Sequence, residues 1–381
     1  MTDLTDYLES YQSALGDGPH ADDIRHCIVS SLRNPDDPMP LYRLALLAQM
    51  RDRWDLWEGA VLLASHLEHD SPQSVFHRAC HRTRLGDWSA YRTLGATMHM
   101  INVDVRRLLW VAHEYDRTTD LSDKTLLIVQ DGGFGDTLNF LCFIRPLATR
   151  AARVILSVPG ELVEFVTHNF GDCAQVVPFD ANAVYENVYH VTEYVWGWWS
   201  AAGLFEGVPL FEPLRAPHPI PRSTFDTRSR QVGICWAASD LPGNPPSPRS
   251  INDLALLEPL FSLQRIEWHS LQVGASASHA ERCPQLRRPD PPLITFEDTA
   301  NLIAGLDAVV SVDTAVCHLA GRLGIPTFTL LHYVADDRWG LGGTTAWYPT
   351  MRLIREHRRD DWPSAIGELA HHLQAAGDRS S

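Results

Sequence analysis

The sequence Ile128-Val-Gln-Asp-Gly-Gly-Phe-Gly-Asp-Thr-Leu-Asn-Phe140 is typical of a buried strand, a glycine loop and the start of a helix. The apolar run at 126–129 is long enough for one interior strand. Gly133 and Gly135 free the backbone for a tight turn, and Asp136 then opens a helix. Such a loop brings backbone N–H groups and a helix N-terminus to one point, where anions bind well. A purely structural turn explains a lone glycine loop equally well.

Length and composition limit the class of protein. A chain of 381 residues predicts two or three domains, because one core rarely organises so many residues. The net charge of −15 argues against a broad nucleic-acid-binding surface. The seven cysteines are widely spread and include no C-x-x-C pair, so neither a disulfide framework nor a zinc site is expected. We expect a cytosolic protein, because no transmembrane run or signal-peptide core is evident.

Residues 1–120 are predicted to form a helical domain. Aromatic and small residues in it repeat with a spacing of 34: Tyr42, Ala45, Trp54 and Trp57 recur as Phe76, Ala79, Trp88 and Tyr91. This is the period of tetratricopeptide repeats (TPR), whose helix pairs stack such residues at fixed offsets. Two copies are too few for a free-standing array, so we expect the block to pack on the rest of the chain. It is either a cap without a partner or a surface that binds an acceptor or another protein.

From about residue 121, predicted strands alternate with predicted helices, which favours parallel sheets with crossover helices. The first run, assigned to a domain at 121–222, has strands at 126–129, 154–158, 175–178 and 189–194. Closely spaced prolines end this run and indicate a linker. The second run, at 223–381, has strands at 232–236, 266–271, 308–312 and 326–331. We predict two Rossmann-like domains that face each other across a cleft, with ligands beyond the carboxyl ends of the strands.

One loop of the second run has the residues of an anion site. Asp313 and Thr314 follow a predicted strand and cap the next helix, and His318 lies on the same helix face as Thr314. A diphosphate at this N-terminus would meet the amides of Thr314 and Ala315, a hydroxyl and a protonatable imidazole. An ordinary helix cap, with His318 packed against the sheet, explains the same residues.

Two other loops add polar groups. One begins at Trp236 and includes Arg249, whose planar guanidinium suits phosphate because it donates two parallel charge-assisted hydrogen bonds. The other would recognise a nucleobase through Gln272 and the backbone of Val273. A surface arginine and a plain strand end are the alternative interpretations.

Together these motifs resemble the heptosyltransferase-like glycosyltransferases of glycosyltransferase family 9. The resemblance covers about residues 121–370 and is carried by four segments: Gly132–Phe140, Arg249–Ile251, Ser270–Gln272 and Ser311–Thr327. The helical front end and Trp347–Arg355 are similar to bacterial members that carry TPR ahead of such a domain. The resemblance implies an α/β fold of the GT-B type, with two Rossmann-like domains and the nucleotide mostly on the second. It also implies inversion at the sugar carbon without a bound metal or other cofactor.

The resemblance assigns roles to individual residues. Asp136 falls on the proposed catalytic base of the family's Gly-x-Gly-Asp loop. The remaining candidates are substrate-binding residues: Gly133, Gly135, Trp236, Arg249, Gln272, Asp313, Thr314, Ala315 and His318. The loop at 241–248 departs from the family, because it lacks the His and Asn-Asp-Arg pattern before the Arg-Ser pair.

The implied function is a metal-independent hexosyl- or heptosyltransferase that moves a sugar from a nucleotide-sugar donor to a hydroxyl of a protein or glycan. The attacking hydroxyl needs a base within reach, and the leaving diphosphate needs preorganised donors such as the Thr314 amide and Arg249. Two alternatives stay open. The altered 241–248 loop motivates a non-catalytic module that binds sugar nucleotides or proteins, and a sugar-nucleotide epimerase has a similar two-domain architecture.

Overall fold

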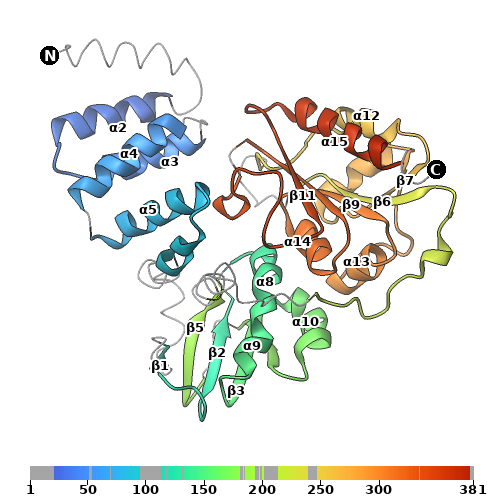
Figure 1. The fold of residues 1–381 in the computed structure, drawn as a ribbon, viewed down its shortest axis with the longest axis horizontal. Helices are drawn as coiled ribbons and strands as arrows, with labels where there is room; N and C mark the ends of the chain where they lie inside the picture. Colours follow the sequence, from blue (N-terminus) through green and yellow to red (C-terminus); the bar gives the residue numbers. More distant parts are fainter. Residues whose placement is uncertain are drawn as a thin grey trace.

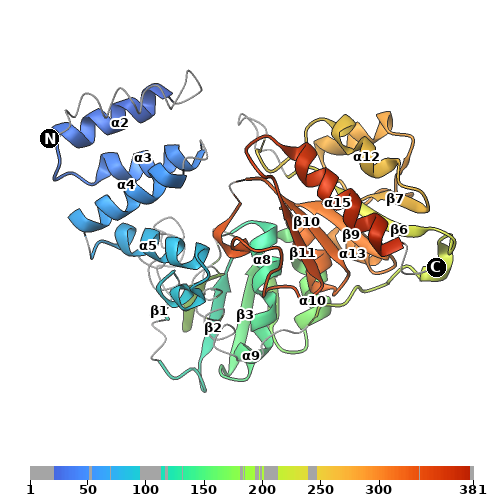
Figure 2. The same ribbon diagram turned by 45° about the horizontal axis from the view of Figure 1, so that its top comes forward.

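The computed structural model describes residues 21–50, 54–68, 70–94, 113–115, 119–130, 132–180, 185–193, 213–238, 247–333 and 335–377, and the single residues 183, 197 and 200. These residues form a helical front end and two α/β halves, with the front end to one side of both halves (Figures 1 and 2). None of the helices in these ranges is long and apolar enough to cross a membrane.

The first α/β half is built on a parallel sheet with the order β1-β5-β2-β3-β4. Its strands are β1 (His113–Glu114), β2 (Thr125–Val129), β3 (Arg153–Val158), β4 (Gln175–Pro178) and β5 (Val188–Thr192). Its helices are α8 (Phe134–Phe140), η2 (Leu141–Phe143), α9 (Ile144–Ala148), η3 (Gly160–Leu162) and α10 (Val163–Phe170). The region predicted to be helical, residues 1–120, is not helical throughout, because β1 lies within it. A two-residue strand is too short to show the alternation that identifies strands in a sequence.

The second half is built on a parallel sheet with the order β11-β10-β9-β6-β7-β8. Its strands are β6 (Arg230–Cys235), β7 (Ile266–Ser270), β8 (Leu286–Arg287), β9 (Ala308–Val312), β10 (Thr327–Leu331) and β11 (Met351–Arg355). Its α-helices are α12 (Glu258–Phe261), α13 (Phe296–Ile303), α14 (Ala315–Arg322) and α15 (Trp362–Gly377). Its 3-10 helices are η4 (Arg222–Thr224), η5 (Leu254–Leu257), η6 (Ala275–Arg282) and η7 (Asp337–Trp339). The prediction of two parallel α/β sheets is confirmed.

The central strand β9 shows why the second sheet forms. All five of its residues are buried. Ala308, Val310 and Val312 pack into one hydrophobic cluster, and Val309 packs into another on the opposite face. Because successive side chains of a strand point to opposite faces, a strand that is buried along its whole length requires cover on both sides. Helices supply that cover on both faces of the sheet. The polar groups that follow the strands therefore lie beyond the strands, at their carboxyl ends.

The front end consists of α2 (Ala21–Arg33), α3 (Met39–Met50), α4 (Trp54–Leu67), α5 (Pro72–Arg84) and η1 (Trp88–Ala90), each packed on the next. The small repeat residues Ala45 and Ala79 are buried on α3 and α5, and the aromatic residues Trp57 and Tyr91 are buried as well. Residues 95–112 lie outside the described ranges, and the assignment as TPR stays a prediction. As expected, the block packs on the rest of the chain, because α5 contacts η7.

Candidate active site

The carboxyl ends of both sheets open onto one cavity of about 810 Å³. The glycine loop after β2 forms one wall, and the loops after β6, β9 and β10 contribute to the other. The structure brings together in this lining all the candidate residues except Trp236 and Gln272: Gly133, Gly135, Asp136, Arg249, Asp313, Thr314, Ala315 and His318. The two halves of the molecule therefore contribute to one site, at the place where parallel α/β sheets bind ligands.

A smaller cavity of about 330 Å³ adjoins the first and shares Phe134, Thr314 and Ala315 with it. Residues 272–276 and 294–296 supply most of its remaining wall. Phe134 of the first half packs edge-on against Phe296 of the second, with ring centroids 5.2 Å apart. The combined space is therefore elongated and bridges the two halves.

Asp136 lies inside the first turn of α8. The sequence pattern predicts that the helix opens at Asp136, but it begins at Phe134 with Gly133 as its N-cap. The Gly133 N–H donates to Asp136 Oδ2 at 2.9 Å, as an acidic residue at this position of a helix often accepts. The carboxylate therefore points back toward the cleft, at the end of the helix where negative charge is favoured.

Gly135 is needed for the close approach of α8 to α14. A Cβ atom at this position would lie 2.8 Å from Cδ2 of His318 and 3.8 Å from the Cα of Ala315. Neither a rigid ring nor a backbone atom can yield easily, so a side chain here would separate the two halves. Glycine is thus required at position 135 for a steric reason, the close contact between α8 of the first half and α14 of the second.

Arg338 is the main site residue that sequence reasoning missed. Its Nη2 lies 2.6 Å from Asp136 Oδ1, and its Nε donates to Asp336 Oδ1 at 3.0 Å. The Arg338 side chain is only 7% exposed, so these contacts are shielded from solvent. A signal existed in the sequence, because Asp336-Asp-Arg-Trp339 follows β10 at the same sheet edge as the other site loops.

The N-terminus of α14 forms the opposite wall. Thr314 is its N-cap, and its hydroxyl makes no capping hydrogen bond. Helix geometry leaves the first amides of α14 without an intrahelical acceptor. Asp313, at the end of β9, is buried, and burial raises the pKa of its carboxyl while the charge of Arg249 opposes that shift. This wall therefore offers backbone donors to a ligand, with Arg249 as the cation that acts most strongly on Asp313.

His318 is neutral in this environment. Burial holds its pKa well below 6.5, and the charges of Arg338 and Arg322 lower it further. Its Nδ1 lies 2.6 Å from the Tyr348 hydroxyl, which donates to Asn139 Oδ1 at 2.6 Å. With that hydroxyl proton committed, Nδ1 is the protonated nitrogen and Nε2 is an acceptor. The sequence predicts that a protonatable imidazole meets a diphosphate here. The neutral His318 can instead accept a hydrogen bond at Nε2 from a hydroxyl group.

The guanidinium of Arg249 is available for hydrogen bonds to a ligand in the larger cavity. Among the described residues its guanidinium makes no ion pair or hydrogen bond, although it lines the larger cavity. The backbone nearby is anchored, because the Ala238 N–H donates to Ser250 Oγ at 3.0 Å. Residues 239–246 lie outside the described ranges, and most of the unusual 241–248 loop falls among them.

Trp236 and Gln272 differ from the expected roles. Trp236 is 1% exposed and packs in the core of the second half, away from the lining of both cavities. Gln272 lines the smaller cavity, but its amide is committed to the protein. Its Oε1 accepts from the N–H groups of Trp236 and Ala237 at 3.1 and 2.9 Å. Its Nε2 donates to the Ala237 and Val273 carbonyls, each at 3.1 Å. Gln272 therefore links two site loops, and its amide is already engaged and does not face a nucleobase as predicted.

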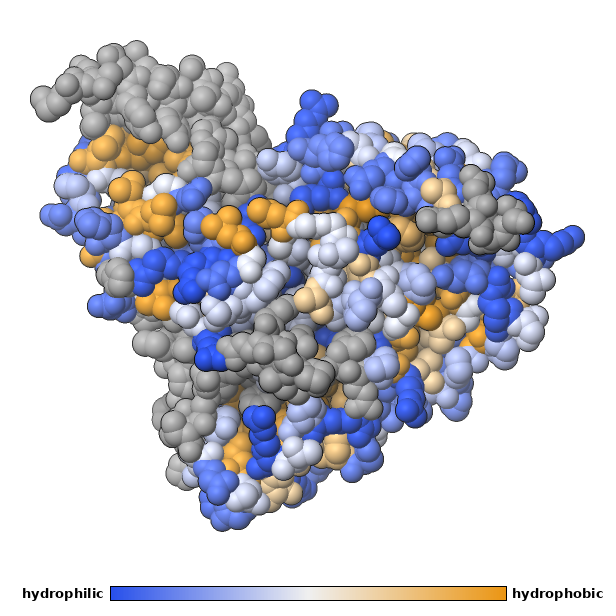
Figure 3. Space-filling model, viewed as in Figure 1, coloured by the Kyte–Doolittle hydropathy of each residue, from blue (hydrophilic) through white to orange (hydrophobic). Residues whose placement is uncertain are grey.

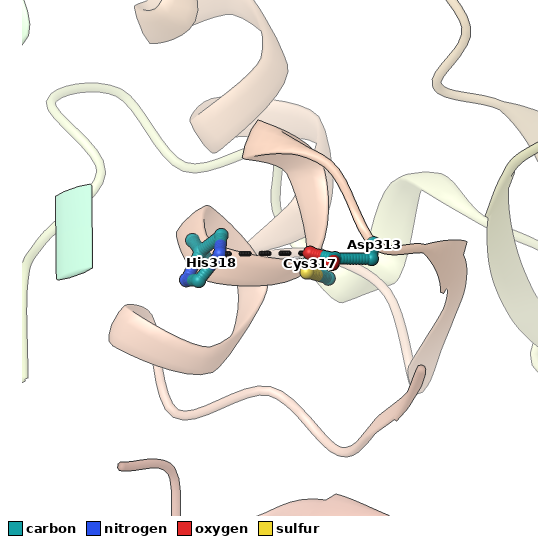
Figure 4. A group of neighbouring side chains, drawn as sticks. All are labelled: Asp313, Cys317 and His318. Carbon is teal, nitrogen blue, oxygen red and sulfur yellow. Dashed lines mark ion pairs between the residues drawn. The ribbon is translucent and has the colours of Figure 1, made fainter. Parts of the chain in front are cut away.

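Asp313, Cys317 and His318 place three potential metal-ligand atoms within 4.8 Å of one another (Figure 4). They fit a cation poorly. Burial raises the pKa of the Cys317 thiol, so its metal-binding thiolate form is disfavoured. The positive charges of Arg249 and Arg338 also act on His318 and would repel a divalent ion. We interpret the group as a buried polar cluster beneath the α14 N-terminus.

Comparison with known proteins finds a family similarity in the second wall. Residues 291–361 match the model of glycosyltransferase family 9 (heptosyltransferase). Protein FlbA of Caulobacter vibrioides is 23% identical over 286 residues, which are 67% of this chain and 47% of FlbA. The chain thus spans about half the length of this relative.

Two solved E. coli structures are also similar. The heptosyltransferase WaaC with ADP-2-deoxy-2-fluoro heptose is 13% identical with a TM-score of 0.42, covering 65% of this chain and 99% of WaaC. The ADP-heptose LPS heptosyltransferase II is 13% identical with a TM-score of 0.44, covering 66% of this chain and 99% of its own. The α14 wall, with η7 and Arg338, lies within the segment that matches the family model, and this match supports an enzyme of the glycosyltransferase class.

Proposed function

We propose that the protein transfers a sugar from a nucleotide-sugar donor to a hydroxyl of a protein or glycan, with inversion and with Asp136 as the base. One observation carries the proposal. The Asp136 carboxylate of one half and the open α14 N-terminus of the other face the same cavity at the carboxyl ends of two parallel sheets. A base and an anion site on opposite sides of one cavity suit an in-line displacement at a sugar carbon.

The donor is proposed to lie along the second half. The smaller cavity would bind the nucleobase of the donor, in contact with the backbone near Val273. The diphosphate would lie at the α14 N-terminus, where the amides of Thr314 and Ala315 and the Arg249 guanidinium supply hydrogen bonds and positive charge. The neutral His318 would accept a hydroxyl of the donor rather than bind phosphate.

In the reaction, the acceptor oxygen attacks the anomeric carbon while the bond from that carbon to the diphosphate oxygen breaks. The acceptor proton passes to Asp136, and the nucleoside diphosphate leaves with the negative charge. Asp136 Oδ2 accepts a hydrogen bond from the Gly133 N–H at 2.9 Å, and Oδ1 lies 2.6 Å from Arg338 Nη2, so the carboxylate is held at the cavity wall, where the acceptor hydroxyl would meet it. Fixed donors around the leaving group need no metal ion to stabilise its charge.

The acceptor is proposed to use the front end. On the face shown in Figure 3, hydrophobic residues gather over the front-end helices. Among the exposed apolar side chains of α4, Leu62 is 50% and Leu63 is 59% exposed. Exposed apolar patches mark binding surfaces more often than chance. We therefore propose that a protein or a glycan-bearing protein docks there.

Mass spectrometry after incubation with a panel of nucleotide sugars and cell extract tests the proposal. ADP-D-β-D-heptose is the first donor to try, because ADP-heptose is named for the similar E. coli enzyme. We expect Asp136→Asn to lower transfer by about 10²–10⁴-fold. Asp123→Asn, which changes an exposed aspartate of the same half, should leave it unchanged. Full activity in a folded Asp136→Asn protein would overturn the proposal.

The same panel separates the alternatives. A thermal shift with a nucleotide sugar but no product would identify a binding module. Interconversion of donor sugars without any acceptor would identify an epimerase.

A further inference from the structure

The 3-10 helix η7 lies between the front end and the cleft. In Figure 1 it is the short orange-red helix beside α5, and α5 contacts it directly. Its three residues face different neighbours. In a 3-10 helix, successive side chains point about 120° apart, so adjacent residues can serve different domains while one short backbone links them.

On its outer side, η7 is held by the front end. Arg84 Nη1, at the end of α5, lies 3.5 Å from Asp337 Oδ1, and these side chains are only 12% and 23% exposed. A Cβ at Gly340 would lie 3.3 Å from the Trp88 ring, so this ring presses closely on the end of η7. The segment from Asp337 to Gly340 is thus seated against α5 and η1 together.

On its inner side, η7 holds the candidate base. Arg338 is fixed at two points by Asp336, whose Oδ1 accepts from the Arg338 backbone N–H at 2.9 Å and from its Nε at 3.0 Å. The same guanidinium reaches Asp136 Oδ1 at 2.6 Å. The Arg338 side chain therefore has little freedom of its own, and its position follows that of η7.

From these contacts we propose that the front end positions a catalytic group of the active site. Arg84 holds Asp337, and η7 in turn keeps Arg338 in contact with Asp136. Arg84, Asp337 and Arg338 are then positioning residues for the base. The inference rests on the proposed function, because it gives Asp136 that role. It adds that the helical front end controls the chemical step as well as presenting an acceptor.

Hydrolysis of the donor distinguishes this inference from a simple acceptor platform. In hydrolysis, water attacks the anomeric carbon, its proton passes to Asp136, and the bond to the departing ADP breaks. Water needs no docking surface, so a front end that only binds acceptors would leave hydrolysis unchanged. A front end that positions Asp136 affects hydrolysis and transfer alike.

The experiment compares full-length Arg84→Ala with wild type in the release of ADP from ADP-D-β-D-heptose. We expect kcat to fall at least about tenfold with little change in KM, because small misplacements of catalytic groups cost about this much or more. The acidic limb of the kcat profile should move to higher pH, because a carboxylate that loses a neighbouring cation is more easily protonated. Arg84→Lys should restore part of the rate.

Arg82→Ala is the matched control. Arg82 lies on the same helix, is 54% exposed and pairs with Asp87 instead of η7. Its loss should change neither kcat nor the pH profile. Equal hydrolysis by Arg84→Ala and wild type would overturn the inference while leaving the proposed function intact. A lack of hydrolysis and transfer by wild type with every donor would count against the proposed function itself.

A crystal structure of Arg84→Ala tests the inference without any donor. We expect Arg338 to have moved away from Asp136, beyond ion-pair distance. An unchanged contact of 2.6 Å would overturn the inference. If Arg84→Ala does not fold, Asp337→Ala removes the other partner of the contact and serves in its place.

Discussion

Helices α8 and α14 both follow a buried strand and both direct their N-termini into the cleft, yet different groups occupy those ends. At the N-terminus of α8, the Asp136 carboxylate accepts a hydrogen bond from the Gly133 N–H and forms an ion pair with Arg338. At α14, Thr314 makes no capping bond, and the nearby His318 is kept neutral by burial. Similar strand–loop–helix units thus form one wall with a fixed anion and another with free donors.

The difference shows how one structural unit serves two chemical tasks. A helix N-terminus attracts negative charge, whichever molecule supplies it. When the chain supplies its own carboxylate, as at Asp136, the position carries the base of the proposed reaction. When the chain leaves the position open, the site is available for the phosphates of a ligand. Single substitutions can disturb the two walls together or separately.

Apart from substitution of Asp136 itself, the largest effect is expected where the walls meet. Gly135→Ala should lower transfer by about 100-fold, because its new Cβ would lie 2.8 Å from the His318 ring and force the walls apart. Gly160→Ala is the control, since nothing lies within 4 Å of its new Cβ. Initial rates at saturating donor measure the effect. Equal rates for Gly135→Ala and wild type would show that close approach of the helices is unnecessary.

A smaller effect is expected on the open wall alone. Arg249→Gln should weaken ADP binding at least about tenfold, because a hydrogen bond to a charged group contributes about 1.5–3 kcal/mol. Isothermal titration calorimetry measures the affinity. Arg228→Gln provides the comparison, because Arg228 is 88% exposed and lies outside the cleft lining. An unchanged affinity for ADP in Arg249→Gln would place the phosphates elsewhere.

The smallest effect concerns stability. Burial, reinforced by Asp336, raises the pKa of Asp337 to about 7 from 3.8, although Arg84 opposes the shift. Between pH 4 and 7 the unfolded chain releases this proton before the folded protein does, so stability falls as the pH rises. The slope from this one group is at most about 1.4 kcal/mol per pH unit.

Asp337→Asn removes that contribution, so urea midpoints measured from pH 5 to pH 8 should decline less than those of wild type. Asp123→Asn, with a side chain that is 72% exposed, should reproduce the wild-type slope. Identical slopes in Asp337→Asn and wild type would show that Asp337 is ionised throughout this range.

Much of the fold was predictable because buried parallel strands are predominantly apolar runs, such as Leu126–Val129 and Ala308–Val312. The site loops followed from the same reasoning, since parallel strands direct their carboxyl ends to one edge. The helical repeat predicted the helices of the front end and their packing on the rest. These features depend on local pattern, which a sequence records directly.

Other features depend on contacts between distant segments. Arg338 was missed because its partner Asp136 lies in the other half of the molecule. Trp236 was assigned to the site because a residue at a strand end has the same pattern whether it faces the core or the cleft. The charge of His318 depends on its burial between two domains, which no local pattern contains.

ADP affinity and sugar transfer, measured in the same Asp136→Asn protein, test the division between the two walls. We expect transfer to be lost while ADP binds at least as tightly as to wild type, because the base and the phosphates occupy different walls. Loss of ADP affinity in parallel with transfer would contradict this division, since Asp136 would then belong to the donor site.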